Sequence, residues 1–254
     1  MSEKGGVAKT LTVANLGPAL AARGLRVLLV DFDPQGDLSA SFGVEDDDQL
    51  VRVEELLAGG HDADGALVDV APAGLAGRLW LLAASRELRG QTARLLRGAG
   101  DGLAGLLDAI DTPTDVVLVD TPAGETIFAA QAIVAAAEII VMVLPGYHEL
   151  RALTRLLDSI DRQSEAAGSD VSLLGVLIAN ADARWRTTRD YAAHLAAEGL
   201  PLFGTVIPRR QAVTGHARYG APTILLEPGN AVAHAYAAVA GEIVDRLALA
   251  GSAP

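Results

Sequence analysis

Residues 4–10 read Lys4-Gly5-Gly6-Val7-Ala8-Lys9-Thr10, and this short stretch decides the fold. Adjacent glycines give the backbone enough freedom for successive N–H groups to converge on an anion. A helical apolar pattern follows over residues 10–23, and the N-terminus of a helix adds partial positive charge. We therefore expect a phosphate-binding loop in front of a helix, with Pro18 inside that helix as a point of kinking.

The two lysines of this loop are unusual in the chain, because every basic residue outside it is arginine. A compact ammonium and a planar guanidinium are not interchangeable at a phosphate site. Lys9 is expected to reach the β- and γ-phosphates, and the Thr10 hydroxyl to coordinate Mg²⁺. The loop departs from G-x-x-x-x-G-K-[ST], since Glu3 and Ala8 stand where that pattern has glycine. The loop alone therefore does not define a nucleotide site, and the prediction needs supporting residues elsewhere in the chain.

Three aspartates supply that support. Asp31 and Asp33 follow the apolar run at 26–30, and Asp120 follows a second run at 116–119. Ligands of open α/β sheets bind outside the carboxyl ends of the strands. A single aspartate after a strand is often only a turn or helix cap. Three of them together with a phosphate loop predict a metal–phosphate site.

Runs rich in Val, Ile and Leu alternate with helical patterns along the whole chain. This alternation predicts an α/β fold with a mostly parallel sheet and helices on both faces. The expected strands are 26–30, 79–83, 116–119, 139–144, 173–179 and 202–206. The expected helices are 10–23, 86–96, 102–110, 129–136, 150–167, 187–197 and 231–249. The length of 254 residues suits one domain, expected over residues 1–250 and followed by a frayed tail at 251–254.

Composition narrows the functional classes. Without cysteine there is no disulfide framework, thiolate zinc site or cysteine-ligated iron–sulfur cluster. No signal peptide is recognisable, and the longest apolar runs are too short to span a bilayer. We expect a cytoplasmic protein that does not bind membranes.

Charge is distributed unevenly. The net charge of −12 argues against a protein that coats nucleic acid with its whole surface. Residues 183–220, however, contain only two acidic residues and six arginines: Arg184, Arg186, Arg189, Arg209, Arg210 and Arg218. A local basic face on an acidic body can still bind phosphates in a salt-dependent way. The alternative is a solvated helix face together with a nucleotide contact.

K-G-G-V-A-K-T at 4–10, D-F-D-P-Q-G at 31–36 and L-V-D-T-P at 118–122 occur in an order and spacing that resemble the ParA/MinD class of deviant-Walker ATPases. Within that class the chain is most similar to ParA partition proteins. The resemblance runs essentially end to end, since L-A-A-S-R-E-L at 82–88 and T-V-I-P-R at 205–209 also fall where ParA-like chains have similar segments.

The resemblance implies an ATPase with defined residue roles. Lys4 matches the signature lysine that crosses a nucleotide-sandwich dimer to the other subunit's phosphates. Asp33 matches the aspartate that positions the attacking water, while Thr10 binds Mg²⁺ and Asp31 and Asp120 support the metal through its water shell. The implied nucleotide-binding residues are Lys4, Gly5, Gly6, Val7, Ala8, Lys9, Thr10, Leu11 and, around the adenine, Asn180, Pro208 and Arg209.

The resemblance also implies partners. ParA-like proteins bind DNA without sequence preference as an ATP-dependent homodimer and are reset by a ParB-like protein or a cargo adaptor, so nucleoid association is expected in the ATP state. By position, the candidate DNA-binding residues are Arg184, Arg186, Arg189, Arg210 and Arg218. One departure is Glu227-Pro228-Gly229-Asn230, where many ParA-like chains carry further basic residues.

Other branches of the class fit less well. MinD-like membrane binding needs a basic amphipathic C-terminal helix, and residues 242–254 contain one arginine. Iron–sulfur carriers need cysteines, and bacterial tyrosine kinases usually carry a tyrosine-rich tail. An ATPase that positions protein cargo along the nucleoid is not separable from a partition ATPase by sequence.

The segment before the loop raises a further alternative. A phosphate loop normally follows a central strand of five or six residues, but only Met1, Ser2 and Glu3 precede Lys4. We expect either that translation begins upstream or that this strand is truncated. Truncation would favour a nucleotide-binding interaction protein with impaired hydrolysis over an active switch.

Overall fold

The computed structural model describes residues 1, 8–44, 49–97, 102–124, 126–209 and 220–249. Its larger sheet is built around strand β1 (Arg26–Asp31). The strand order is β2-β3-β1-β4, with β2 at Val68–Asp69, β3 at Arg78–Leu82 and β4 at Val116–Asp120. β1 pairs in parallel with β3 and β4, while β2 is antiparallel to β3. Apart from Arg26 every residue of β1 is buried, as expected for a parallel strand covered on both faces.

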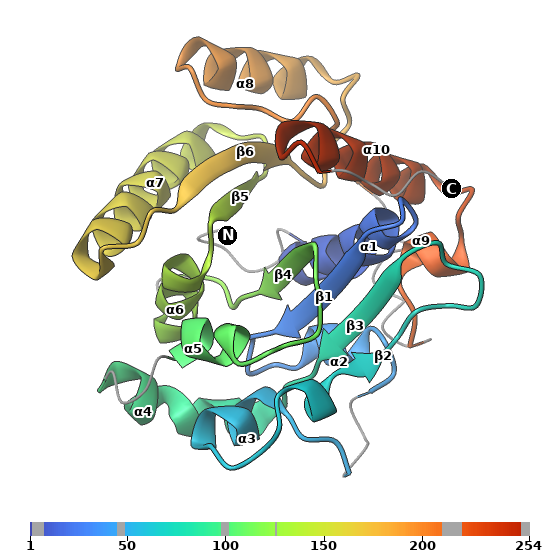
Figure 1. Cartoon of the computed structure of the whole chain (residues 1–254). Coiled ribbons are helices and arrows are strands. Elements are labelled where there is room, and N and C mark those ends of the chain that lie inside the picture. The colour runs from blue at the N-terminus through green and yellow to red at the C-terminus, as the bar shows by residue number, and fades with distance from the viewer. Residues whose placement is uncertain (2–7, 45–48, 98–101, 125, 210–219, 250–254) are drawn as a thin grey trace.

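Alternate residues of β1 enter two different cores. Val27 and Leu29 pack with helices α1 (Lys9–Ala21) and α10 (Ala231–Arg246). Leu28 and Val30 pack on the other face with α3 (Val53–Ala58), α5 (Gly102–Asp108) and α6 (Ile127–Ala135). This period-two division places helices on both faces of the sheet, as Figure 1 shows.

A second, two-stranded sheet contains β5 (Glu138–Val143) and β6 (Ser172–Ile178) in parallel. One face packs against α7 (Tyr147–Ala167) and α8 (Arg186–Ala197). Met142 and Leu177 on its other face join the core formed by α1 and α10. The two sheets therefore share one helical layer.

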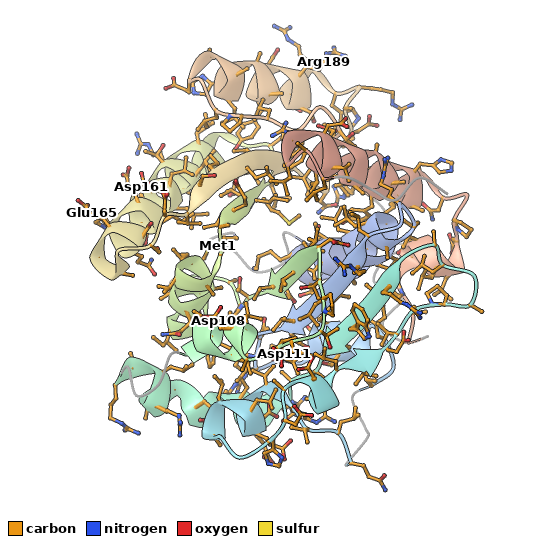
Figure 2. All side chains as sticks on the ribbon, viewed as in Figure 1. Met1, Asp108, Asp111, Asp161, Glu165 and Arg189 are labelled. Atoms are coloured by element: carbon orange, nitrogen blue, oxygen red, sulfur yellow. The ribbon has the colours of Figure 1, made fainter. Side chains whose placement is uncertain are left out.

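Between the two sheets lies Met1 (Figures 1 and 2). Its main-chain nitrogen donates to the Ile140 carbonyl at 2.7 Å, and its carbonyl accepts from the Met142 N–H at 3.0 Å. Within the described ranges no strand pairing joins β4 to β5. The expected mostly parallel sheet with helices on both faces is confirmed, but its described strands form two sheets.

The expected strand at 202–206 is wrong. Leu202 makes only an isolated bridge to Val176. The N–H groups of Gly204 and Thr205 donate instead to the Glu242 carboxylate on α10, at 2.7 and 3.0 Å. Backbone donation from this segment to β6 is therefore limited, in the described residues, to the Phe203 and Ile207 N–H groups, on either side of the two that the Glu242 carboxylate accepts.

Most other expected elements are confirmed with small shifts in their ends. The helix expected at 86–96 is divided into the 3₁₀ helix η2 (Arg86–Gln91) and α4 (Thr92–Leu96). α1 continues through Pro18 as expected. Four short helices were not predicted: α2 (Asp37–Ala40), α3, η1 (Asp64–Ala66) and α9 (Thr223–Leu226). In the parts of the chain described, no helix is both long enough and apolar enough to cross a membrane.

Candidate nucleotide site

The loop residue Ala8 has a left-handed backbone conformation, with φ 64° and ψ 32°. Its carbonyl accepts from the Thr12 N–H at 2.8 Å, so the first turn of α1 forms directly behind it. Lys4, Gly5, Gly6 and Val7 lie outside the described residues. An L-residue pays roughly 1–2 kcal/mol in this conformation, whereas glycine pays none.

Lys9 opens α1 and is partly buried. Burial lowers the pKa of its ammonium, and the negative charges of Asp120 and Asp33 act in the opposite direction. The structure therefore brings the loop lysine together with two of the three predicted aspartates. A partly buried ammonium beside carboxylates is suited to contact a phosphate.

Asp31 is fully buried at the end of β1 and is held by defined donors. The Ser39 N–H and hydroxyl both donate to its Oδ2, at 2.8 and 2.7 Å, and the Asp33 N–H donates to Oδ1 at 3.3 Å. Burial nevertheless raises the pKa of Asp31 to about 6. Because its oxygens are occupied by donors of the chain itself, Asp31 acts here as the anchor of the turn that carries Asp33.

Ser39 was missed by sequence reasoning. Its hydroxyl also accepts from the Ala84 N–H at 3.1 Å, which ties α2 to the end of β3. The only sequence feature that pointed to it is a serine in the first turn of a helix that follows Gly36. Serine is common near the start of a helix, so only the tertiary structure reveals its contact with Asp31.

Asp120 differs from Asp31 although the two stand opposite each other across β1 and β4. Neither carboxylate oxygen of Asp120 has a hydrogen bond of good geometry within the described residues. Burial, and then the nearby charge of Asp31, raise the pKa of Asp120 to about 8, while the Thr10 hydroxyl lowers it. Buried polar atoms are rarely left unpaired in folded proteins. These oxygens are thus the feature of the site that a cation fits.

Asp33 lies in the turn after β1 and is partly exposed. Its Oδ1 accepts from the Gln35 N–H at 2.9 Å, and its carbonyl accepts from the Gly36 N–H at 3.0 Å. Gly36 has a φ of 70°, which favours glycine at the position where the turn enters α2. Asp33 is therefore fixed by its own turn at the edge of the site.

The residues expected around an adenine form a separate group. Asn180 follows β6 with a φ of 53°. The next residue, Ala181, bridges Pro208, and the Arg209 N–H donates to the Ala181 carbonyl at 3.3 Å. The structure brings these three residues together.

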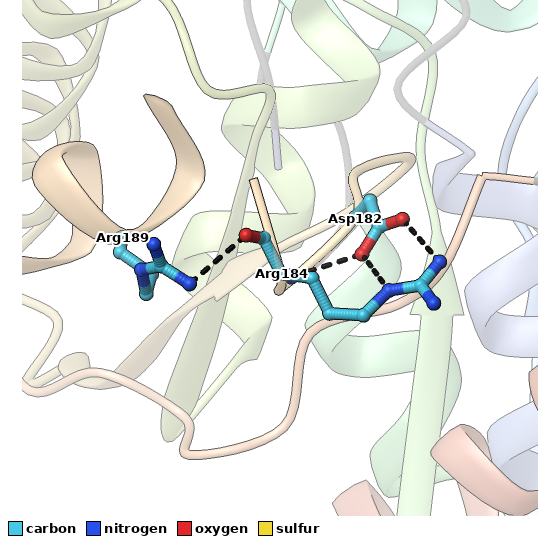
Figure 3. Close-up of polar contacts among 3 residues, drawn as sticks. All are labelled: Asp182, Arg184 and Arg189. Carbon is cyan, nitrogen blue, oxygen red and sulfur yellow. Dashed lines mark hydrogen bonds and ion pairs between the residues drawn. The ribbon is translucent and has the colours of Figure 1, made fainter. Parts of the chain in front are cut away.

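The arginines at the start of α8 are already engaged within the chain (Figure 3). Arg184 forms a forked contact with Asp182, with nitrogen–oxygen distances of 3.0 and 2.8 Å, and this contact holds the pKa of Asp182 at about 2. Arg186 pairs with Asp190 at 3.3 Å, and Arg189 donates to the Arg184 carbonyl at 2.9 Å. Arg210 and Arg218 lie outside the described residues. The described arginines thus form an exposed, partly neutralised cluster.

The donor set around Asp120 suits a magnesium–phosphate group. Mg²⁺ is usually held by one or two carboxylates together with substrate phosphates and water. Here Thr10 and the unpartnered oxygens of Asp120 would face the metal, while Lys9 would face the phosphates. The arrangement defines a class: an α/β protein with a phosphate loop and paired carboxylates at the carboxyl ends of parallel strands.

Comparison with known proteins gives the family. A family model described as an AAA domain matches residues 1–173. The chain is 31% identical to the chromosome partitioning protein ParA of Caulobacter vibrioides, over 96% of this chain and 92% of that protein. It is 32% identical to the chromosome-partitioning ATPase Soj of Thermus thermophilus, over 97% and 94%. The chain belongs to the ParA/MinD-type P-loop ATPases.

A solved structure extends the likeness to three dimensions. Cobyrinic acid a,c-diamide synthase of Mycobacterium smegmatis, with a bound ATP analogue and magnesium, is 32% identical, with a TM-score of 0.81. The match covers 98% of this chain and 93% of that one.

Replacing Asp120 tests the electrostatics of the site. Between the ordinary aspartate pKa near 4 and the folded value of about 8, the folded state retains a proton that the unfolded state has lost. This carboxyl therefore makes the nucleotide-free protein less stable as pH rises through that range. We expect Asp120→Asn to raise the Tm at pH 8, by about 2–4 °C for each kcal/mol added to the free energy of unfolding. The Tm of this variant should also change less with pH than the Tm of the unmodified chain. Scanning calorimetry from pH 5 to 8 measures both effects, with the exposed Asp161→Asn as control. A Tm at or below that of the unmodified chain at pH 8 would contradict the prediction.

Replacing Ala8 tests the loop backbone. Ala8→Gly removes the cost of the left-handed conformation but adds chain entropy to the unfolded state, so a net stabilisation of up to about 1 kcal/mol is expected. Urea denaturation measures the change. Ala14→Gly, inside α1 where the backbone is helical, should instead destabilise by about 1 kcal/mol or more. Loss of stability in Ala8→Gly would show that Ala8 is not strained.

Proposed function

We propose that the protein is a ParA-like ATPase that binds ATP·Mg²⁺, closes into a homodimer, binds DNA without sequence preference and is reset when a partner stimulates slow hydrolysis. The observation that supports this most directly is the meeting of Lys9, Thr10 and the unpartnered carboxylate of Asp120. The relatives named for chromosome partitioning support DNA as the cargo.

The residues would divide the work of phosphoryl transfer, which depends mainly on positioning and on neutralising γ-phosphate charge. Lys9 would hold the β- and γ-phosphates within one subunit. Asp33, fixed by its turn, would orient the attacking water. When bound, Mg²⁺ would neutralise charge on the same phosphate oxygens, held by Thr10 with Asp120 behind its water shell. Asp31, whose oxygens already accept hydrogen bonds within the chain, would support the metal site indirectly by anchoring the turn that carries Asp33.

Lys4 would complete the pocket from the second subunit, as an arginine finger does. Hydrolysis would then require the dimer, and a ParB-like protein or a cargo adaptor would accelerate it. Leu11, Asn180, Pro208 and Arg209 would complete the nucleotide pocket together with the loop. The nucleotide-binding unit is proposed to be a single domain over residues 1–250.

DNA binding would use Arg184, Arg186 and Arg189, together with Arg210 and Arg218. The contacts of Arg184 and Arg186 with Asp182 and Asp190 reduce the positive charge that each subunit presents. Dimerisation doubles the patch, so DNA affinity would appear mainly in the ATP state. The protein would be cytoplasmic and associated with the nucleoid in that state.

Two alternatives use the same fold. In the first, the protein is an ATPase that positions a protein assembly along the nucleoid instead of partitioning DNA. A nucleotide-binding interaction protein with impaired hydrolysis is the other, because no pairing between β4 and β5 supports the loop within the described residues. Retained ATP binding without any DNA- or partner-stimulated turnover would favour the interaction protein.

Variants at Lys4 and Asp33 should separate dimer formation from the hydrolysis step. Lys4→Ala is expected to bind ATP as the unmodified chain does but to lose stimulated turnover. Asp33→Ala is expected to bind ATP, to accumulate as a dimer and to turn over at least about a hundredfold more slowly, in line with the loss of a general base. Phosphate release with random DNA and sedimentation with ATP measure these outcomes.

The exposed Asp37→Ala, four residues from Asp33, is the matched control and should leave turnover unchanged. Full turnover in Lys4→Ala would refute its role across the dimer, and a monomeric Asp33→Ala with ATP would refute the assigned role of that aspartate.

Charge reversal tests the DNA face. Arg184→Glu with Arg186→Glu should weaken ATP-dependent binding to random duplex DNA at least about tenfold, since phosphate contacts dominate non-specific affinity. The exposed pair Arg151→Glu with Arg162→Glu on α7 carries the same charge change outside the cluster and should have a much smaller effect. Fluorescence anisotropy at several salt concentrations measures both. Equal losses in the two double variants would remove α8 from the DNA face.

A further inference from the structure

Trp185 is a large aromatic side chain that the fold leaves in solvent. It is 55% exposed, and of the large apolar residues that are exposed in the described part of the chain it alone is aromatic. A tryptophan side chain can bury about 150–250 Å², so on the order of 100 Å² of indole surface is open to a ligand. α8, which this residue precedes, lies at the outer edge of the molecule (Figure 1).

Helix capping does not account for a tryptophan at this position. Trp185 is the N-cap residue of α8, where Ser, Thr, Asp and Asn are preferred because their side chains accept a backbone N–H. The Trp185 side chain makes no such bond. It is also not part of the core that α8 forms with α7, β5 and β6. Neither local helix stability nor core packing therefore requires an aromatic residue here.

The main chain of Trp185 is nonetheless fixed by hydrogen bonds. Its N–H donates to the Asp182 carbonyl at 3.0 Å, and its carbonyl accepts from the Thr188 and Arg189 N–H groups at 3.1 and 3.2 Å. The indole is thus attached to an ordered backbone and has only two side-chain torsions of its own. A ligand that covers the ring therefore costs the protein little conformational entropy.

Three arginines accompany the indole. Arg184 and Arg186 flank Trp185 in the sequence, and Arg189 lies one helical turn further along α8. The side chains of Arg184 and Arg186 are each 88% exposed, although each is paired with an aspartate. Arg189 donates to the Arg184 carbonyl (Figure 3) and has no ion pair within the described residues. Three guanidinium groups against the two aspartates leave a net charge of +1 beside the indole.

This combination of charge and aromatic surface favours one form of nucleic acid. A net charge of +1 attracts phosphates only weakly, since non-specific affinity depends on how many phosphates are neutralised. An exposed indole adds a different contact, because every nucleobase has a face that can stack on it. In a duplex those faces are already stacked on neighbouring bases, whereas in a single strand they are free. The surface around Trp185 therefore matches a single strand better than a duplex.

We propose that Trp185 stacks on an unpaired base of single-stranded DNA while Arg184, Arg186 and Arg189 contact the adjacent phosphates. The proposal rests on the proposed function, because it uses the same arginine cluster, and it adds a preference of that cluster for single strands. Tryptophan and arginine are also enriched where proteins bind one another, so self-association is measured alongside DNA binding.

Fluorescence anisotropy of labelled probes of about sixteen nucleotides measures the stacking contact, with the full chain, ATP and Mg²⁺. The probes are oligothymidylate, an abasic strand with the same number of phosphates, and a duplex of random sequence. The unmodified chain should bind oligothymidylate at least about tenfold more tightly than the abasic strand, because only the former can stack on the indole. Equal affinities for these two strands would overturn the proposal.

Variants at Trp185 locate the contact. Trp185→Ala should weaken oligothymidylate binding at least about tenfold and leave binding of the abasic strand and the duplex unchanged. Trp185→Phe keeps an aromatic face and should recover most of the loss. The control Leu96→Ala removes another exposed apolar side chain, on α4, and should change nothing. Tryptophan fluorescence should fall when the unmodified chain binds oligothymidylate, but not in Trp185→Ala, which retains Trp80.

Salt dependence separates stacking from charge. For a single strand, each phosphate contact contributes about 0.7 to the slope of log affinity against log salt concentration. Trp185→Ala should lower the affinity for oligothymidylate at every salt concentration without changing that slope. Arg189→Gln should instead reduce the slope by about 0.7. A reduced slope in Trp185→Ala would show that the variant disturbs the arginines and would refute the stacking role.

Failure of this proposal is distinguishable from failure of the proposed function. If the unmodified chain binds none of the probes with ATP, non-specific DNA binding is itself refuted. If the duplex binds and Trp185→Ala leaves oligothymidylate affinity unchanged, only the stacking role is refuted. Equal losses for the duplex and the single strand would refute the preference for single strands. A change in sedimentation of DNA-free Trp185→Ala, with circular dichroism showing intact folding, would assign the indole to a contact between two copies of this chain.

Discussion

The parallel pairing of β1 with β4 is the constraint on which the site depends. Its register sets Asp31 opposite Asp120 at the carboxyl ends of two buried strands, where burial and the charge of Asp31 raise the pKa of Asp120. The chain resolves the conflict unequally. Asp31 accepts three hydrogen bonds from its own turn and α2, whereas the oxygens of Asp120 accept none within the described residues. Asp31 is thus held in place by the chain, and Asp120 remains available to a ligand that binds beside Lys9.

The helix that carries Lys9 is held at both ends. At its C-terminus the Ala21 carbonyl accepts from the Gly77 N–H at 2.8 Å, and a side chain at Gly77 would come within 2.0 Å of the Leu25 carbonyl. Near its N-terminus the Thr12 hydroxyl contacts that of Tyr236 at 3.0 Å, and Asn15 accepts from the Ile224 N–H at 2.9 Å. α9 and α10, more than 200 residues away in sequence, therefore fix the position of the phosphate loop's helix.

Sequence patterns predicted the long elements well because their apolar periodicity reflects burial, which the structure reproduces in β1, β6, α7 and α10. They failed where a distant side chain decides the local structure. Residues 202–206 have a strand-like composition, but the N–H groups of Gly204 and Thr205 donate to Glu242. Short helices such as α2 and α9 were missed because four residues do not establish a period. The role of Ser39 was missed because it arises from contacts between segments.

By itself the sequence determined the family and the chemical types at the site: a lysine and a threonine opening a helix, and three aspartates after two strands. Residue type and spacing carry that information because phosphate and magnesium accept few alternatives. Only the tertiary structure decided which carboxylate accepts hydrogen bonds within the chain and how Arg184 and Arg186 are paired. Those properties depend on distances and burial between residues far apart in the chain, and a linear pattern does not contain them.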